Sequence, residues 1–264
     1  MSRLSAIRQI LEDSHQPRFR FDQITTSIYQ KAYQKYSQIP GMPSNLKQQI
    51  IDQLGDDILT ISSREEIKGD NAHKVLFQTR DGHHLESVRL QYKSHASLCI
   101  SSQAGCALAC TFCATGAIGL KKNLTEDEIV DQVLWFQKRG LDISRIIFMG
   151  MGEPLSNPLN TFDALRTITD PKLLGISPRR VSVSTVGIVP MMTKLTDQFP
   201  NVNLAFSLHS PFPQERTSLM PITKAYSIEK VFEGLDYHLK KTNHKVFIIY
   251  ILLIFDLEYA SIRK

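Results

Sequence analysis

From Ser97 onward the sequence alternates short apolar runs with amphipathic segments, and this alternation restricts the possible folds more than any other feature. The amphipathic segments have helical spacing, and the clearest begins at Thr125, where Thr125 and Glu128 form a capping box. The apolar runs have the length and residue content of strands, and they read SLCIS, RIIFMG, RVSVST, VNLAFSLH and KVFIIYIL. Because strands that alternate with helices form parallel sheets, open or rolled into a barrel, the sequence predicts an α/β fold.

The first 96 residues have a different pattern. Residues 1–62 carry apolar side chains at helical spacing, such as Ile7, Ile10 and Leu11, and we expect a small helical accessory domain there. Two β-rich runs then flank Asp81-Gly82, a dipeptide typical of tight hairpins. Residues 63–96 are therefore predicted to form a linker and a β-hairpin. The linker is expected somewhere within residues 61–72. Residues 97–264 form the third predicted domain, which contains the alternating strands and helices.

The composition is that of an ordinary globular chain. The sequence has 264 residues, of which 42% are hydrophobic and 22% charged, with a formal charge of +5. No stretch approaches the ~20 apolar residues of a membrane span, and charged residues interrupt the apolar positions of the first segment, unlike a signal peptide. We expect a cytoplasmic protein with no membrane partner. The small basic excess is compatible with a nucleic-acid partner.

Three of the four cysteines, Cys106, Cys110 and Cys113, have the spacing C-x3-C-x2-C directly after the first predicted barrel strand. Without an export signal, such a cluster more often binds metal than forms disulfides. Three thiolates are one fewer than hold an ordinary [4Fe–4S] cluster, so one iron would stay open to a substrate or cofactor. The alternative is zinc, which needs a fourth ligand, and neither Cys99 nor His209 completes a recognised zinc spacing.

Polar residues follow the next predicted strands, at the end of the sheet where such folds bind ligands. Glu153 lies in the sequence Gly-Met-Gly-Glu-Pro after the second barrel strand, Ser184 ends the third, and Ser207 and His209 end the fourth. On the residues alone, Glu153 is equally well a solvated turn residue and His209 a structural hydrogen-bonding residue. Likewise, Cys99 alone would be a buried core cysteine, and Glu86 alone a solvated strand residue close to Arg89.

Together these motifs resemble the radical S-adenosylmethionine enzymes and, among them, the rRNA adenine methyltransferases Cfr and RlmN. The resemblance extends to about residue 251 and implies a partial (β/α)6 radical-SAM barrel with about five strands present. Besides the three-cysteine motif, it rests on residues 99–106, 123–125, 150–154, 207–209 and 215–222. Residues 118–125 and 177–190 are more similar to Cfr than to RlmN.

The resemblance implies a set of roles that the residues alone do not establish. Cys106, Cys110 and Cys113 would hold a [4Fe–4S] cluster, whose open iron chelates S-adenosylmethionine. An electron donor such as flavodoxin would then allow its cleavage to a 5′-deoxyadenosyl radical. Glu86 would accept a proton, and Cys99 would form a disulfide with a second, methyl-carrying cysteine and so release the methylated RNA. The residues implied to bind S-adenosylmethionine are Gly152, Glu153, Ser184, Ser207, Leu208 and His209.

The substrate implied by the resemblance is an adenine in the peptidyl transferase region of 23S rRNA. A Cfr-like enzyme methylates its C8 and confers antibiotic resistance, whereas an RlmN-like enzyme methylates C2. We expect a monomer that contacts RNA through its basic N-terminal region, including Arg18, Arg20, Lys31 and Lys35. The alternative for this region is a solvated helical face that packs on the barrel.

The sequence departs from the family pattern at its C-terminal end. Relatives continue into a sixth barrel strand and the methyl-carrying cysteine, whereas this sequence has no cysteine after Cys113 and ends in LLIFDLEYASIRK. We therefore expect a truncated chain with impaired methylation. Two alternatives remain: another radical enzyme that needs only the cluster and S-adenosylmethionine, and a non-catalytic remnant that binds the cluster or RNA.

Overall fold

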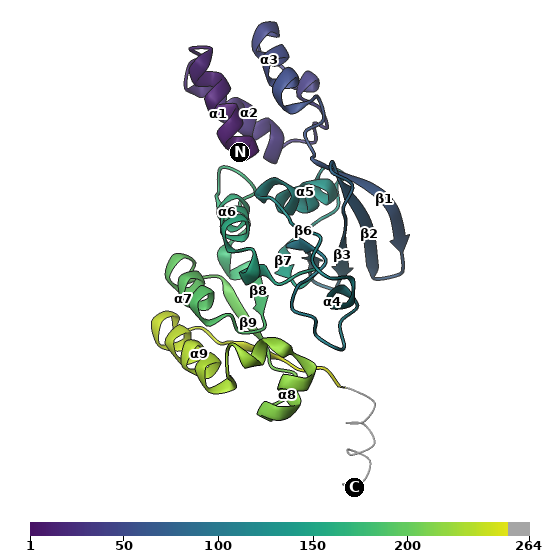
Figure 1. The fold of residues 1–264 in the computed structure, drawn as a ribbon. Coiled ribbons are helices and arrows are strands. Elements are labelled where there is room, and N and C mark those ends of the chain that lie inside the picture. Colours follow the sequence, from purple (N-terminus) through teal and green to yellow (C-terminus); the bar gives the residue numbers. More distant parts are fainter. Residues whose placement is uncertain (253–264) are drawn as a thin grey trace.

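A single mixed sheet runs through most of the molecule in the computed structural model, which describes residues 1–252 (Figure 1). Its strand order is β1-β2-β3-β4-β7-β8-β9-β10, with β1 and β10 at the two edges, so the sheet is not closed into a barrel within the described residues. Five strands pair in parallel: β4 (Ala96–Cys99), β7 (Arg145–Phe148), β8 (Val181–Thr185), β9 (Asn203–Ser207) and β10 (Phe247–Ile249). These are the five strands predicted from the apolar runs, and the predicted α/β class is confirmed.

Four helices cover one face of the parallel strands and follow one another along it (Figure 1). They are α5 (Glu126–Gln137), α6 (Pro158–Thr169), α7 (Val189–Gln198) and α9 (Ile228–Thr242). Alternate strand residues toward these helices are apolar and fully buried, as Phe148, Val183 and Phe206 illustrate. The opposite, concave face therefore carries the other set, which includes Ser184 and Ser207.

The capping box predicted at Thr125 starts α5 as expected. The Glu128 amide donates to Thr125 Oγ1 at 3.3 Å, and the Thr125 amide donates to a Glu128 carboxylate oxygen at 2.9 Å. This reciprocal pair satisfies two amides that would otherwise have no partner at the helix start. It fixes the point at which the chain enters the first helix after the cysteine motif.

The segment expected to be a linker is instead a strand. Residues 61–68 form β1 (Ile61–Lys68), which pairs antiparallel with β2 (Ala72–Thr79), and β2 pairs across the predicted Asp81-Gly82 turn with β3 (His84–Gln91). The predicted hairpin is therefore confirmed, but it is one part of a three-stranded meander that joins the parallel strands at β4. Strand β1 escaped prediction because its sequence, ISSREEIK, is mostly polar, as suits an exposed edge. The division into three domains stays a prediction.

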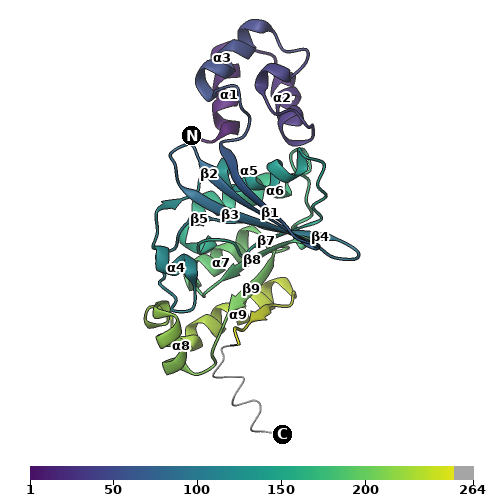
Figure 2. The ribbon, with the colours of Figure 1, turned by 90° about the vertical axis from the view of Figure 1, so that its right-hand side faces the viewer.

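The N-terminal helices form a separate layer at one end of the sheet (Figure 2). They are α1 (Arg3–Asp13), α2 (Phe19–Tyr29) and α3 (Ser44–Leu54), with the 3-10 turn η1 (Tyr36–Gln38) between the last two. Two aromatic residues of the region expected to meet RNA, Tyr29 and Tyr36, are buried in its core. Their side chains cannot stack on bases in this conformation, whereas Phe19 of the same region is exposed beside Arg20.

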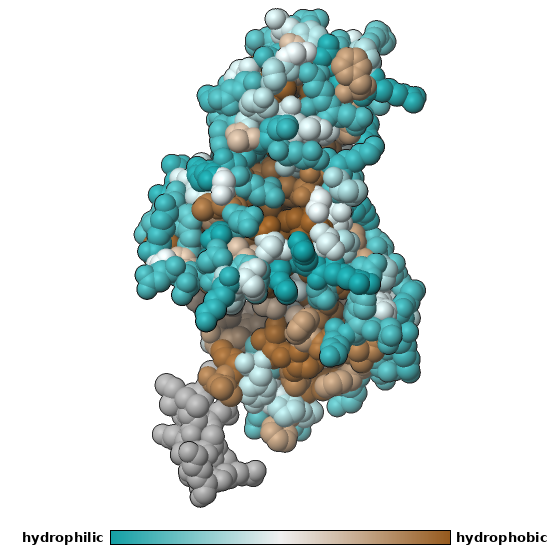
Figure 3. All heavy atoms as spheres, turned by 180° about the vertical axis from the view of Figure 1, so that it is seen from behind, coloured by the Kyte–Doolittle hydropathy of each residue, from teal (hydrophilic) through white to brown (hydrophobic). Residues whose placement is uncertain are grey.

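The last parallel strand, β10, pairs with β9 alone among the described residues. Its side chains Phe247 and Ile248 are more than half exposed, and Figure 3 shows apolar surface in the lower half of the molecule. The predictions made for the tail concern residues 253–264, which lie outside the described part of the chain. Within residues 1–252, no helix is both long and apolar enough to cross a membrane.

Candidate functional site

A cavity of about 260 Å³ lies where the parallel strands β7, β8 and β9 end. The cavity is formed by the ends of several different strands together with the cysteine loop, which is the position predicted for ligand binding in this fold class. Its lining contains eight of the predicted site residues: Cys106, Cys110, Cys113, Gly152, Glu153, Ser184, Ser207 and His209. Three predicted residues do not line it, namely Glu86, Cys99 and Leu208.

The cysteine loop runs between the short strand β5 (Gln103–Ala104) and helix α4 (Ala114–Ile118). Glycine is required at its base, because Gly105 has a φ of +79° and a Cβ there would meet the carbonyl oxygen of Gly119 at 1.9 Å. At its tip, the Thr111 amide donates to the Leu219 carbonyl at 2.9 Å. The loop is thus fixed by backbone contacts at its base and at its tip, and its cysteines line the cavity.

All four cysteines are free thiols. Burial raises the pKa of the Cys110 thiol to about 11, and burial also raises the pKa of Cys106. Among the described residues, no three His, Cys, Asp or Glu side chains converge on one point where a single metal ion could bind. All three thiols line one cavity, and three thiolates are the donor set that fits a [4Fe–4S] cluster with one iron left open.

Gly150 and Gly152 allow close packing against the segment that leads into the cysteine loop. A Cβ on Gly150 would lie 2.6 Å from Ser101 Oγ, and a Cβ on Gly152 would lie 2.5 Å from Gln103 Cβ. Gly152 also has a φ of +95°, which L side chains rarely adopt. The resemblance implies that Gly152 binds S-adenosylmethionine. In the structure, the space beside both glycines is filled by the chain's own residues.

Glu153 is nearly fully buried, with 4% of its surface exposed. Its carboxylate accepts hydrogen bonds from the amide of Val186 at 3.0 Å and from the amide of Leu155 at 3.1 Å. Burial raises the pKa of Glu153 to about 7, although the hydrogen bonds from Thr185 and the two amides oppose this shift. The solvated-turn interpretation of Glu153 is wrong: this carboxylate joins the ends of β7 and β8 at the wall of the cavity.

The end of β9 supplies the opposite wall. Ser207 Oγ lies 3.2 Å from Ser184 Oγ on the neighbouring strand. His209 has a φ of +59°, and its ring packs edge-on against Phe112 of the cysteine loop, with 4.7 Å between ring centroids. Both polar backbone groups of Leu208 are used internally: its amide donates to Ile249 and its carbonyl accepts from Arg216.

The His209 ring is suited to meet a ligand. Its Nδ1 atom is buried and has no hydrogen-bond partner among the described residues, and buried polar groups are rarely left in this state. Burial, and secondly the charge of Arg216, lowers the pKa of His209 to about 4, so the ring is neutral at pH 7. A neutral ring can donate or accept one hydrogen bond at this atom, which fits a polar ligand in the cavity.

Cys99 and Glu86 lie on the same face of the sheet, beside the cavity. Cys99 pairs with Val88 across β3 and β4, and Glu86 is two residues from Val88, so all three side chains share one face. Burial raises the pKa of the Cys99 thiol to about 11, and the thiol bonds to the backbone of Met149, which lines the cavity. Glu86 forms an ion pair with Lys74 at 2.7 Å, rather than with the nearby Arg89 considered from the sequence.

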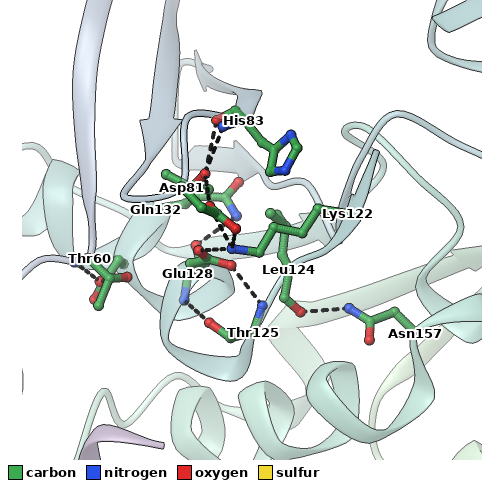
Figure 4. A network of polar contacts seen from close by, with 11 residues as sticks. Thr60, Asp81, His83, Lys122, Leu124, Thr125, Glu128, Gln132 and Asn157 are labelled. Carbon is green, nitrogen blue, oxygen red and sulfur yellow. Dashed lines mark hydrogen bonds and ion pairs between the residues drawn. The ribbon is translucent and has the colours of Figure 1, made fainter. Parts of the chain in front are cut away.

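A network of charges fixes the chain where it leaves the cysteine loop (Figure 4). Lys122, in strand β6 (Lys122–Asn123), donates to Asp81 at 2.7 Å and to Glu128 at 2.7 Å. Asp81 belongs to the hairpin turn and Glu128 to the capping box of α5. Asn157 bonds the carbonyls of Ser102 and Leu124, on either side of the loop. The loop is therefore anchored to three separate elements.

Comparison with known proteins agrees with this arrangement. Residues 100–260 match the family model described as the Radical SAM superfamily. A solved structure described as a radical SAM methyltransferase from Sphaerobacter thermophilus superposes with a TM-score of 0.89 at 32% identity, covering 95% of this chain and 75% of that one. The fold and the cavity are therefore those of a radical SAM protein.

Similarity to curated proteins is more specific. The ribosomal RNA large subunit methyltransferase Cfr of Staphylococcus warneri is 46% identical over 248 residues, which cover 94% of this chain and 71% of that protein. The Cfr protein of Lachnoclostridium phytofermentans is 41% identical over 254 residues, covering 96% and 73%. The chain belongs to the radical SAM superfamily and, within it, to the family of these Cfr methyltransferases.

Proposed function

We propose that this chain takes part in radical S-adenosylmethionine methylation of an adenine in 23S rRNA, at C8 as the resemblance to Cfr implies. The observation that carries the proposal is the shared cavity, which is lined by three free thiols, a buried carboxylate and a histidine whose Nδ1 has no partner in the part of the chain that the structure describes. When bound, the [4Fe–4S] cluster supplies the electron that cleaves S-adenosylmethionine into a radical. Membership of the Cfr family supports the same activity and its outcome, ribosomal antibiotic resistance.

The residues of the chain have separate tasks in this proposal. Cys106, Cys110 and Cys113 hold the cluster, and the walls formed by Glu153, Ser184, Ser207 and His209 bind and orient S-adenosylmethionine. His209 Nδ1 meets a polar atom of this cofactor, since the neutral ring offers one unfilled hydrogen bond. Gly152 supports the site by allowing the chain to pack behind it, and Leu208 supports it through its backbone.

Cys99 and Glu86 have tasks in the RNA step. Cys99 would attack the sulfur of the methyl-carrying cysteine in the protein–RNA adduct, so that an S–S bond forms and the S–C bond to the RNA-bound carbon breaks, and Glu86 would accept a proton. Cys99 is the only cysteine outside the three-cysteine motif in the 264 residues. Since disulfide exchange needs two different sulfurs, the second thiol is not among these residues.

Iron binding is the first experiment. After anaerobic reconstitution, the chain should bind about four irons, and C106A, C110A and C113A should each lose them. C99A is the matched control, because it removes a buried cysteine outside the motif and should retain the iron. Tightly bound zinc without iron–sulfur absorption would support the zinc alternative instead.

Methylation is the second experiment. The chain alone, and the chain fused to the C-terminal segment of a Cfr relative, are incubated with S-adenosylmethionine, a one-electron reductant and 23S rRNA, and the target adenosine is analysed by mass spectrometry. We expect the fused chain to form 8-methyladenosine. Formation of 2-methyladenosine would favour the RlmN-like alternative, and an unmodified base with a loaded cluster would favour the non-catalytic remnant.

A further inference from the structure

Arg216 is a fully buried arginine beside the cavity, and within residues 1–252 its guanidinium bonds only uncharged groups. It lies in helix α8 (Pro213–Leu219) and is 0% exposed. The guanidinium also lies over the face of the Phe206 ring, with its Cζ atom 5.2 Å from the ring centroid. Its hydrogen-bond acceptors are the carbonyls of Val186 at 2.7 Å, Ser207 at 3.0 Å and Leu208 at 3.0 Å, and the hydroxyl of Thr223 at 2.7 Å.

The other fully enclosed arginine, Arg3, shows what is unusual about Arg216. Arg3 forms a bidentate ion pair with Asp131. Within residues 1–252, no carboxylate lies within 4 Å of Arg216; the neighbouring Glu215 instead accepts a hydrogen bond from Ser210 at 2.8 Å. A buried charge without a counter-charge is strongly destabilising. The position of Arg216 therefore calls for an anion that the described residues do not provide as a carboxylate.

The groups around Arg216 point to the cysteine cavity as the place of that anion. Val186 and Ser207, two of its acceptors, line the cavity. The helix that carries Arg216 ends at Leu219, whose carbonyl holds the cysteine loop through the Thr111 amide. Burial lowers the pKa of Arg216, and the Cys110 thiol of the cysteine loop acts in the opposite direction. Thiols become thiolates when they bind metal, so a loaded site would place negative charge opposite this guanidinium.

We propose that Arg216 is a positioning residue that supplies the counter-charge for the iron–sulfur cluster and raises its reduction potential. This inference rests on the proposed function, because it requires the cluster. Accepting one electron from an external one-electron donor makes the cluster more negative, and a fixed positive charge in a poorly solvated site stabilises that reduced form. Through its bonds to Ser207 and Leu208, the same side chain holds the end of β9 against the cavity.

The test separates the charge of Arg216 from its hydrogen bonds. R216M removes both, whereas R216K keeps the charge and loses most of the bonds. The matched control is K138M: Lys138 is also buried and also holds only carbonyls, those of Ile28, Lys31 and Tyr33, but it does so beside the N-terminal helices. Each variant of the chain is reconstituted anaerobically, its iron is counted, and its reduction is followed by spectroscopic redox titration.

We expect R216M to shift the reduction equilibrium against the reduced cluster on the order of tenfold, which is about 59 mV for one electron. R216K and K138M should stay close to the unsubstituted chain. If R216M fails to bind iron while R216K and K138M bind it, the requirement for charge is likewise supported. The proposal is overturned if R216M binds the cluster and its reduction potential is unchanged. It is also overturned if R216M and R216K both lose iron while K138M retains it. Loss of iron from the unsubstituted chain would instead contradict the proposed function.

Discussion

Asp131 holds Arg3 with both of its carboxylate oxygens, at 2.7 and 2.8 Å, across 128 positions of sequence. Arg3 is in the first helix of the N-terminal layer, and Asp131 is in the first helix after the cysteine loop. Asp131 also accepts bonds from the amide and hydroxyl of Thr60, just before β1. One buried carboxylate therefore joins the N-terminal helical layer, the three-stranded meander and helix α5, which covers the parallel strands.

Replacing Arg3 by Met should destabilise the chain by about 3–5 kcal/mol, because the substitution leaves Asp131 buried without its counter-charge. The measurement is the free energy of unfolding in denaturant. The exposed pair between Lys35 and Asp56, at 3.7 Å, serves as control, and K35M should cost less than about 1 kcal/mol. Equal effects of the two substitutions would contradict this account of the buried pair.

Glu153 should make the stability of the metal-free chain fall as the pH rises. Burial raises its pKa to about 7 from 4.5, so between these values the folded chain retains a proton that the unfolded chain releases. The stabilisation is complete below the unfolded pKa and is lost as the pH rises through 7, up to about 3 kcal/mol. The measurement is the free energy of unfolding of the chain and of E153Q as a function of pH, and E153Q should lack this decrease. Burial also raises the pKa of Asp127 to about 6, but this contribution is common to both proteins and cancels.

Cys99 should react slowly with alkylating reagents in the folded chain. With a pKa of about 11 against an ordinary value of 9.0, its thiolate fraction at pH 8 is lower by about a hundredfold, and the thiolate is the reactive form. The measurement is the rate of iodoacetamide addition in a variant in which the three motif cysteines are Ser. The same variant in denaturant should react at the ordinary rate, and a fast folded-state reaction would show that Cys99 is already activated.

Charge reversal on the N-terminal layer should weaken RNA binding. Arg18 and Lys31 are exposed, and phosphate contacts by such residues make affinity fall with salt. We expect R18E/K31E to lower affinity for a 23S rRNA fragment by about tenfold at low salt and to reduce the salt slope by roughly one to two units. K240E, which reverses an exposed charge on α9, should have little effect. If K240E, which changes the net charge half as much, loses half as much binding free energy, net charge alone determines binding.

The sequence predicted the parallel strands well because each combines an apolar run with a polar residue at its end. It predicted the start of α5 for a local reason as well: Thr125 and Glu128 are close in sequence and bond each other. Strand β1 was missed because its stability comes from pairing with β2, while its own residues resemble a polar linker. A strand that is stabilised by pairing with another part of the chain need not alternate apolar and polar residues. A polar edge strand therefore has no periodic pattern from which to predict it.

The site was predicted less evenly than the fold. The three cysteines were found from spacing alone, whereas the roles of Ser184, Ser207 and His209 required a family resemblance. Arg216 belonged to a recognised motif, yet nothing in the sequence shows that its charge is buried with no carboxylate nearby among the described residues. Three of its four acceptors are backbone carbonyls, which come from two different segments. Backbone acceptors have no residue identity and therefore leave no trace in a sequence.

The close packing behind Gly150 and Gly152 has a consequence for how this chain can change over generations. A side chain at position 152 would overlap Gln103, and one at position 150 would overlap Ser101. Positions 101 and 103 lie on the path to the cysteine loop, so a bulkier residue on either side would displace the loop. A smaller residue at position 101 or 103 would not remove the conflict, because a Cβ at 150 would also lie 2.7 Å from the Ile100 backbone and Gly152 has a φ of +95°. Both positions are therefore restricted to glycine by the backbone itself, and a compensating mutation elsewhere cannot release either of them.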